Sequence, residues 1–164
     1  FSAFFYLFFY IIFLITFFSI LLCLKRSNNS IELKKISDLK NLFIINPTLS
    51  LIFALTLFSF AGIPPLAGFF IKMFLFFSLL TNQLFFISIF LILVSGISCF
   101  YYIRLIKIMF FSNSINVTSW IFLIKINSLI SYIIAVSFLV NIFFIFYPEF
   151  FLLIINDVIF SFYL

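Results

Sequence analysis

Histidine is absent from this sequence, and acidic residues, glycine and cysteine are few: four aspartates and glutamates together, three glycines and two cysteines. The lack of histidine removes the commonest proton shuttle and the commonest metal ligand. Cys23 and Cys99 lie in different apolar stretches without Cys-x-x-Cys spacing, so neither a disulfide nor a metal site is indicated. There is also no nucleotide-binding loop and no flavin motif. We therefore expect no metal, no cofactor and no hydride or electron chemistry on this chain.

Charged residues make up only 8% of the 164 residues, whereas 67% are hydrophobic and the mean hydropathy is +1.45. A soluble domain is about half apolar and a quarter charged, and a chain of this length could not bury so much apolar surface. The composition predicts an all-α, polytopic membrane protein in contact with lipid. The net charge of +5 does not indicate a nucleic-acid partner, because the basic residues lie at the ends of apolar segments.

Four apolar segments predict four transmembrane helices, over about 1–24, 47–80, 84–109 and 120–147, in a single membrane domain covering 1–164. The tail 149–164 is too short to cross, and we expect an interfacial helix there. The positive-inside rule puts loops 25–46 and 110–119 on the inner side and the C-terminus on the outer side. Of the nine basic residues, only Lys72 departs from this pattern.

The second apolar segment is too long for one straight span. As a single helix, residues 47–80 would measure roughly 50 Å, against a hydrocarbon core of about 30 Å. Gly62, Pro64, Pro65 and Gly68 lie near its middle and predict a break over about 62–68. Interrupted helices mark ion sites in transporters, although an ordinary proline kink stabilised by packing would explain the break, taken alone, equally well.

Lys72 is the one charged residue between Lys40 and Arg104, and its neighbours are apolar for a full turn on each side. A lysine at the centre of a spanning helix costs about 2.5–3.5 kcal/mol on insertion scales, so it needs a partner, a hydrated pocket or a neutral state. Burial disfavours the charged amine, which allows proton exchange near neutral pH. We therefore interpret Lys72 as a proton-transfer residue. The alternative is an ion pair that serves assembly alone, whose carboxylate another chain would supply.

Polar residues recur on one side of the third apolar segment. Ser88, Ser95 and Tyr102 follow at seven-residue steps, and Ser98 lies four residues before Tyr102. Ser95, Ser98 and Tyr102 are candidates for a water path. Small residues such as Ser95, Gly96 and Ser98 also allow close helix packing, and the sequence leaves both interpretations open.

The segment around the break carries a recognisable motif. Residues Leu57–Lys72, which read Leu-Phe-Ser-Phe-Ala-Gly-Ile-Pro-Pro-Leu-Ala-Gly-Phe-Phe-Ile-Lys, closely resemble the broken twelfth helix of the subunit 2 family of respiratory complex I, whose bacterial counterpart is subunit N of NADH–quinone oxidoreductase. Residues 4–10, 36–42 and 101–105 agree with the family in order and spacing. The resemblance implies an antiporter-like, proton-pumping subunit of 14 helices, of which this chain would supply the last four, with Lys72 at the outward end of the proton path.

The resemblance also implies a location and partners. The chain would lie in the mitochondrial inner membrane, with loops 25–46 and 110–119 on the matrix side and the C-terminus on the intermembrane-space side. FMN, iron–sulfur clusters and ubiquinone would belong to other subunits, and lipids, antiporter-like subunits and small membrane-arm subunits would surround it. The family's glutamate and first lysine are missing, so we expect a split gene whose N-terminal part forms a separate chain.

Two other functions stay open at this point. The chain could be a subunit of a multisubunit cation/proton antiporter, whose larger subunits share the motif of residues 57–72. It could also be a purely structural fragment needed to assemble the membrane arm. Co-purification with flavin and iron–sulfur clusters would exclude the first, and a loss of function on replacing Lys72 would exclude the second.

Overall fold

The computed structural model describes residues 2–24, 36–40, 42–64, 66–111 and 128–153. All regular secondary structure in these ranges is helical, which confirms the predicted all-α class for this part of the chain. Residues 148–153 are helical again after a break at Tyr147. The other helices are α1 (Ser2–Cys23), the 3-10 helix η1 (Ile36–Leu39), α2 (Leu42–Ile45), α3 (Pro47–Ala61), α4 (Ala67–Thr81), α5 (Phe85–Phe111) and α6 (Ser128–Phe146).

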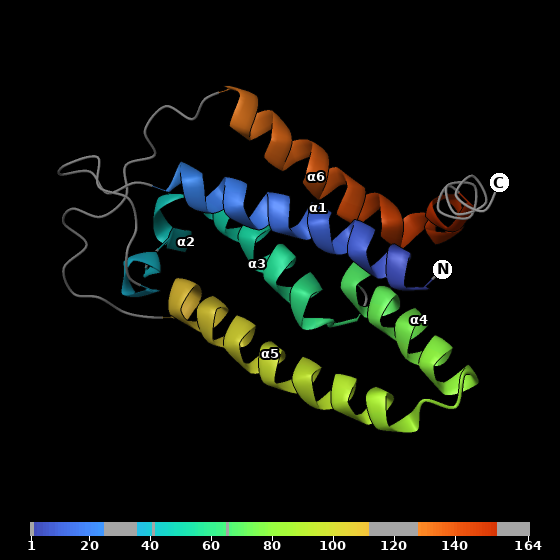
Figure 1. Ribbon diagram of the computed structural model, residues 1–164. Coiled ribbons are helices and arrows are strands. Elements are labelled where there is room, and N and C mark those ends of the chain that lie inside the picture. Colours follow the sequence, from blue (N-terminus) through green and yellow to red (C-terminus); the bar gives the residue numbers. More distant parts are fainter. Residues whose placement is uncertain (1, 25–35, 41, 65, 112–127, 154–164) are drawn as a thin grey trace.

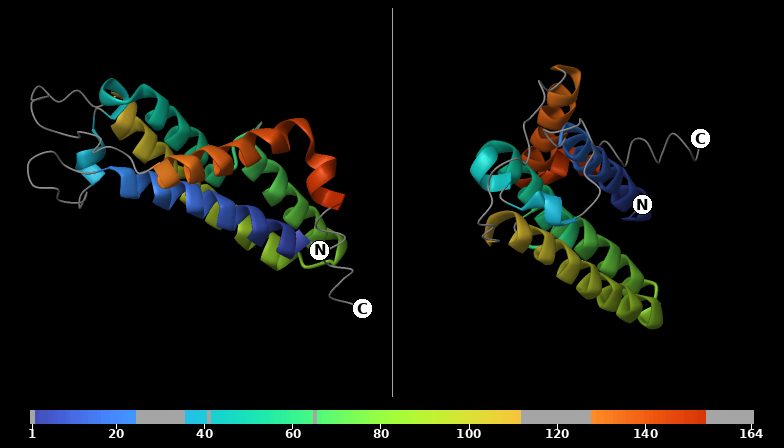
Figure 2. Two further views of the ribbon diagram at one scale, coloured as in Figure 1. Left: turned by 90° about the horizontal axis from the view of Figure 1, so that it is seen from above. Right: turned by 90° about the vertical axis from the view of Figure 1, so that its left-hand side faces the viewer.

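The helices form an elongated bundle in which α1 runs between α6 and the α3–α4 pair in the view of Figure 1. α5 and α6 lie on opposite sides of the bundle, in the end-on view of Figure 2 as well, and α3 and α4 follow one another between α1 and α5. α1 packs against α3, α4 and α6, and α5 packs against α3 and α4. The junction between α3 and α4 is therefore flanked by α1 and α5.

Helix lengths separate two kinds of segment. α1 with 22 residues and α5 with 27 residues are long and apolar enough to cross a membrane. α3 and α4 have 15 residues each, or roughly 22 Å, so neither alone crosses a hydrocarbon core of about 30 Å. α5 buries only Ser88, Ile106 and Met109, and its Phe86 is 85% exposed. An apolar helix with so little burial is typical of a face covered by lipid or another protein.

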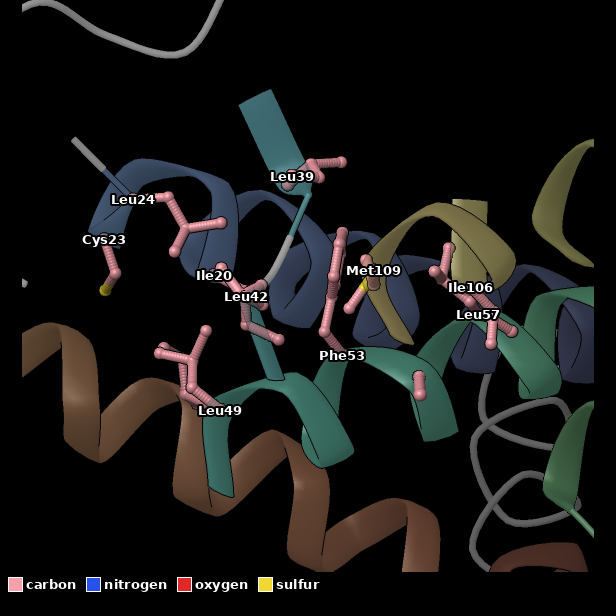
Figure 3. Packing of buried hydrophobic residues seen from close by; sticks show 12 residues of the cluster. Ile20, Cys23, Leu24, Leu39, Leu42, Leu49, Phe53, Leu57, Ile106 and Met109 are labelled. Carbon is pink, nitrogen blue, oxygen red and sulfur yellow. The ribbon is translucent and has the colours of Figure 1, made fainter. Parts of the chain in front are cut away.

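Two clusters of buried side chains hold the bundle together. The first lies where α1 ends and α3 begins, and Figure 3 shows its members Ile20, Leu24, Leu42, Phe53 and Met109. The second surrounds the first half of α1 and consists of Phe5, Phe9, Phe13, Phe60, Ala67, Ile71, Phe144 and Phe151. Because this cluster contains residues from the end of α3 and the start of α4, it fixes both sides of their junction against α1.

Some of the sequence predictions fall outside the described residues. Residues 25–35 of loop 25–46 and residues 112–119 of loop 110–119 lie outside, as do 120–127 of the fourth predicted span and 154–164 of the predicted interfacial tail. Within the described end of loop 25–46, Leu39 and Leu42 are 6% and 0% exposed. This segment therefore packs on the bundle.

Candidate functional site

Gly62 builds the break between α3 and α4. α3 ends at Ala61, and Gly62 adopts the left-handed conformation with φ +80° and ψ 40°, which glycine reaches without steric cost. The N–H of Gly62 donates to the carbonyls of Phe58 and Ser59 at 3.0 and 3.1 Å, and the N–H of Ile63 donates to Phe58 at 3.2 Å. These bonds form the Schellman closure of a helix C-terminus, so α3 stops inside the bundle.

Two carbonyl oxygens at this end of α3 lose their usual donors. In an uninterrupted α-helix each carbonyl accepts from the N–H four residues later. For Phe60 and Ala61 those residues are Pro64 and Pro65, which carry no N–H. Pro65 itself lies outside the described residues, but its lack of a donor follows from its identity. The sequence thus leaves both carbonyls without helical donors at the negative end of the α3 dipole.

Lys72, in the second turn of α4, supplies the missing donors. Its Nζ donates to the carbonyl oxygen of Phe60 at 2.7 Å and to that of Ala61 at 3.1 Å. A cation is stabilised at a helix C-terminus, and hydrogen bonds from an ionised donor are stronger than neutral ones. An ammonium group has three hydrogens, and the third has no acceptor among the described residues.

Two glycines allow α4 to approach α3 this closely. A Cβ at Gly68 would collide with the backbone oxygen of Ser59, so the absence of a side chain lets the first turn of α4 lie against the last turn of α3. A Cβ at Gly62 would lie 3.0 Å from Cδ and 3.3 Å from Nζ of Lys72. A Cβ at Gly96, in contrast, would meet nothing within 4 Å, so the described residues give Gly96 no packing role.

Lys72 lines a cavity of about 480 Å³ between α1, α3, α4 and α5. The structure brings the three residues predicted for a water path into the same cavity as Lys72, whereas Ser88 does not line it. Ser95 and Ser98 each donate their hydroxyl hydrogen to a carbonyl of α5 at 2.8 Å, which leaves their lone pairs free to accept. The polar residues of the lining are Tyr6, Tyr10, Ser59, Lys72, Ser95, Ser98 and Tyr102.

Two tyrosines of this lining were missed by the sequence reasoning. Tyr6 and Tyr10 stand four residues apart and so share one face of α1, and their rings stack with centroids 5.7 Å apart. Tyr10 meets the ring of Phe60 edge-on at 5.7 Å, and Phe60 stacks on Tyr102 at 5.4 Å. Phe60 therefore joins α1 to α5 through its ring while its carbonyl binds Lys72.

Lys72 has only backbone carbonyls as hydrogen-bond partners within the part of the chain that the structure describes. Glu149, the acidic residue whose side chain is described, is exposed. No group of side chains suited to a metal ion occurs among the described residues. The lysine is thus held by uncharged oxygen atoms beside a cavity whose lining combines polar and apolar side chains.

Comparison with known proteins shows the family to which this chain belongs. The chain is a member of the NADH:quinone oxidoreductase/Mrp antiporter transmembrane family, whose model matches residues 1–98, more than half of the chain. The matched range includes the helix break, Lys72 and both tyrosines of α1. The family predicted from the motif of residues 57–72 is thereby confirmed.

Within this family, the chain is similar to particular oxidoreductase subunits. NADH-ubiquinone oxidoreductase chain 2 of Arabidopsis thaliana is 47% identical over 94 residues, which cover 57% of this chain and 18% of the relative. The protein of the same name from Marchantia polymorpha is 37% identical over 132 residues, 80% of this chain and 26% of the relative. NADH-quinone oxidoreductase subunit N of Pelagibacter ubique is 44% identical over 95 residues, 58% of this chain and 20% of the relative. The chain thus spans about a fifth to a quarter of the length of these relatives.

Proposed function

We propose that this chain is part of the proton-translocating membrane subunit of a respiratory NADH:quinone oxidoreductase, and that Lys72 exchanges the translocated proton. The observation that carries the proposal is the pair of hydrogen bonds from Lys72 Nζ to the carbonyls of Phe60 and Ala61, at an interrupted helix beside a cavity that also contains serine and tyrosine side chains. Ionisable residues at membrane depth face a protein-lined or hydrated interior and mark proton or ion paths. The family and the named relatives support the assignment to a membrane subunit of this kind of oxidoreductase.

The amine of Lys72 has the chemistry that proton exchange requires. A neutral amine keeps two hydrogens, so both bonds to the carbonyls can persist when one proton leaves. The third proton of the ammonium group is then the one that departs and returns. The negative end of α3 favours the charged form, whereas the apolar surroundings oppose it. A change in a neighbouring charge shifts this balance, so that Lys72 takes a proton from the inner part of the proton path and releases it toward the outer side of the membrane.

We also propose how the chain crosses the membrane. α3 and α4 together form one discontinuous span, because either helix alone is too short, and α1, α5 and α6 form the other three in one membrane domain. These spans correspond to the last four helices of a 14-helix antiporter-like subunit. Arg104 and Lys107, exposed in the last two turns of α5, lie on the matrix side with loops 25–46 and 110–119. The C-terminus lies on the intermembrane-space side, and Lys72 at the outward end of the path.

The same proposal specifies the partners of this chain and the membrane in which it lies. Lipids and the neighbouring antiporter-like and small membrane-arm subunits surround the bundle, and FMN, iron–sulfur clusters and ubiquinone are bound by other subunits. Similarity to plant proteins named NADH-ubiquinone oxidoreductase chain 2 supports the mitochondrial inner membrane as the location.

The test is replacement of Lys72 by methionine in the assembled complex. With the complex reconstituted into vesicles and supplied with NADH and a quinone, we expect Lys72→Met to lower the number of protons translocated per electron. Lys107→Met is the matched control, because Lys107 is exposed near the end of α5, and it should leave the ratio unchanged. An unaltered ratio in Lys72→Met would contradict the role of Lys72 and favour a structural fragment.

The proteins and cofactors that co-purify with this chain distinguish an oxidoreductase subunit from an antiporter subunit. The family description covers both oxidoreductase and antiporter subunits, whereas the relatives described above bear the names of oxidoreductase subunits. Affinity purification of this chain from mildly solubilised membranes should recover flavin and iron–sulfur absorbance together with NADH oxidation. Recovery of antiporter subunits without flavin would contradict the assignment.

A further inference from the structure

We propose that the hydroxyl groups of Tyr10 and Tyr6 in α1 form the outlet of the proton path. They would relay the proton from Lys72 toward the end of the bundle where Ser2 contacts Ser78. The sequence-based water path uses residues of α5 alone and gives α1 no role. The new assignment rests on the proposed function, because it concerns the proton that Lys72 exchanges. It makes the two tyrosine hydroxyls, rather than only the serine stripe of α5, part of the path.

Contacts along α1 place the two tyrosines at successive levels between the helix break and that end of the bundle. The hydroxyl of Ser2 donates to that of Ser78, near the end of α4, at 2.7 Å. Further along α1, Phe5 packs against Phe74 with ring centroids 5.8 Å apart. Still further, Tyr10 contacts Phe60, whose carbonyl binds Lys72.

Tyr6 follows directly after Phe5 in α1, and so stands between the Ser2 end and Tyr10. A separation of four residues corresponds to roughly 6 Å along a helix axis, a distance that one or two water molecules bridge. From the break to the Ser2 end, the order along α1 is therefore Tyr10, Tyr6 and then the Ser2–Ser78 pair.

The hydroxyl groups of Tyr6 and Tyr10 are available for a proton path, because they form no hydrogen bond within the described part of the chain. Both side chains line the cavity of about 480 Å³ that contains Lys72, and neither hydroxyl bonds to another described residue. Their rings are already accounted for by stacking on each other and by the contact with Phe60. The cavity offers water as a partner for both hydroxyls, because its volume is large enough for several molecules at about 30 Å³ each.

The proton transfer conserves every charge and atom on the tyrosines. The ammonium group of Lys72 gives a proton to a neighbouring water, and that water passes a proton to the oxygen of the Tyr10 hydroxyl. As this O–H bond forms, the original O–H bond of Tyr10 breaks and its proton moves to the next water. Tyr6 repeats the step toward Ser2 and Ser78. Each phenol ends with the protonation with which it began, so neither tyrosine has to ionise.

Tyr10→Phe and Tyr6→Phe test the proposal, since each removes one oxygen and keeps the stacked ring. The variants are compared with Tyr101→Phe, whose side chain is 59% exposed and does not line the cavity. Lys72→Met is measured in parallel. In the vesicle-reconstituted complex, normalised to the assembled enzyme, the readouts are protons translocated per electron and the solvent deuterium isotope effect on coupled turnover.

We expect both cavity variants to lower the translocation ratio severalfold and to raise the isotope effect, while Tyr101→Phe matches the wild type. A ratio that falls without a change in isotope effect, or that falls equally in Tyr101→Phe, would show a packing role and overturn the outlet. If Lys72→Met lowers the ratio while both tyrosine variants behave as wild type, the outlet is wrong and Lys72 keeps its role. If Lys72→Met is also without effect, the proposed function fails and the outlet fails with it.

Discussion

Lys72 completes the hydrogen bonding of Phe60: its Nζ lies 2.7 Å from the carbonyl oxygen that an uninterrupted helix would bond to the N–H of residue 64. Residue 64 is proline, so that N–H does not exist. A buried acceptor left without a partner costs about 1–3 kcal/mol. The proline that breaks the helix and the lysine that caps it are therefore coupled. A substitution of either residue should change the hydrogen bonding of the Phe60 carbonyl.

Restoring the missing donors should displace the lysine. The double variant Pro64→Ala, Pro65→Ala gives Phe60 and Ala61 helical N–H donors again, so that α3 can extend and its last carbonyls no longer need Lys72. We expect fewer protons translocated per electron in the reconstituted complex. Pro148→Ala, which changes a proline that follows α6 and lies outside the α3–α4 junction, is the control. A double variant that translocates protons like the wild type would contradict the coupling of break and lysine.

Arginine at position 72 should separate capping from proton exchange. A guanidinium group still donates to carbonyls but does not release its proton in proteins. Lys72→Arg should therefore preserve the thermal stability of the assembled complex while lowering proton translocation, whereas Lys72→Met should lower both. The expected loss of stability in Lys72→Met is about 2–6 kcal/mol, because two acceptors lose their partner at about 1–3 kcal/mol each. Normal translocation in a stable Lys72→Arg complex would show that Lys72 does not exchange the proton.

Gly68 and Gly96 should respond differently to alanine. A Cβ at Gly68 would collide with the carbonyl oxygen of Ser59, which is backbone and cannot rotate away, whereas a Cβ at Gly96 meets nothing within 4 Å. We expect Gly68→Ala to destabilise the subunit by about 3 kcal/mol or more. Gly96→Ala should be neutral, or stabilising by up to about 1 kcal/mol through helix propensity. Thermal denaturation of the two variants in detergent measures the difference, and equal midpoints would refute the close approach of α3 and α4.

The turn after α4 offers a stabilising substitution. Gln83 has φ +58°, and the N–H groups of Gln83 and Leu84 donate to the carbonyls of Leu80 and Leu79, both at 3.0 Å. This is a helix C-terminus of the kind that favours glycine in the left-handed position. Gln83→Gly should raise the free energy of unfolding by up to about 1 kcal/mol. Asn82→Gly is the control, because φ there is −86°, and it should not stabilise. A lower melting temperature for Gln83→Gly would contradict this turn geometry.

Local features of the site could be predicted from the sequence because backbone chemistry fixes them. Glycine and proline limit the main chain wherever they stand, so Gly62 and Pro64 locate the end of α3 directly. Helical periodicity places Ser95, Ser98 and Tyr102 near one face of a helix, and all three line one cavity with Lys72. The roles proposed for these residues in proton transfer stay predictions.

The partners of Lys72 could not be predicted from the sequence because they depend on how α3 and α4 pack. Sequence reasoning sought a carboxylate or a hydrated pocket, and it had no means to place the lysine amine on the carbonyls eleven and twelve residues earlier. The spacing of two prolines four residues after Phe60 and Ala61 is the signal that would have indicated them. Tyr6 and Tyr10 were missed for a related reason, since only tertiary packing brings α1 to the break.

The most direct test of the role of Lys72 is an electron cryomicroscopy structure of the assembled complex at a resolution that shows water. We predict that the amine nitrogen lies within about 3.2 Å of the carbonyl oxygens of both Phe60 and Ala61, with ordered water beside it in the cavity between α1, α3, α4 and α5. An unbroken helix through residues 61–67, or an amine directed into a dry, lipid-facing space, would contradict both the cap and the proton path built on it.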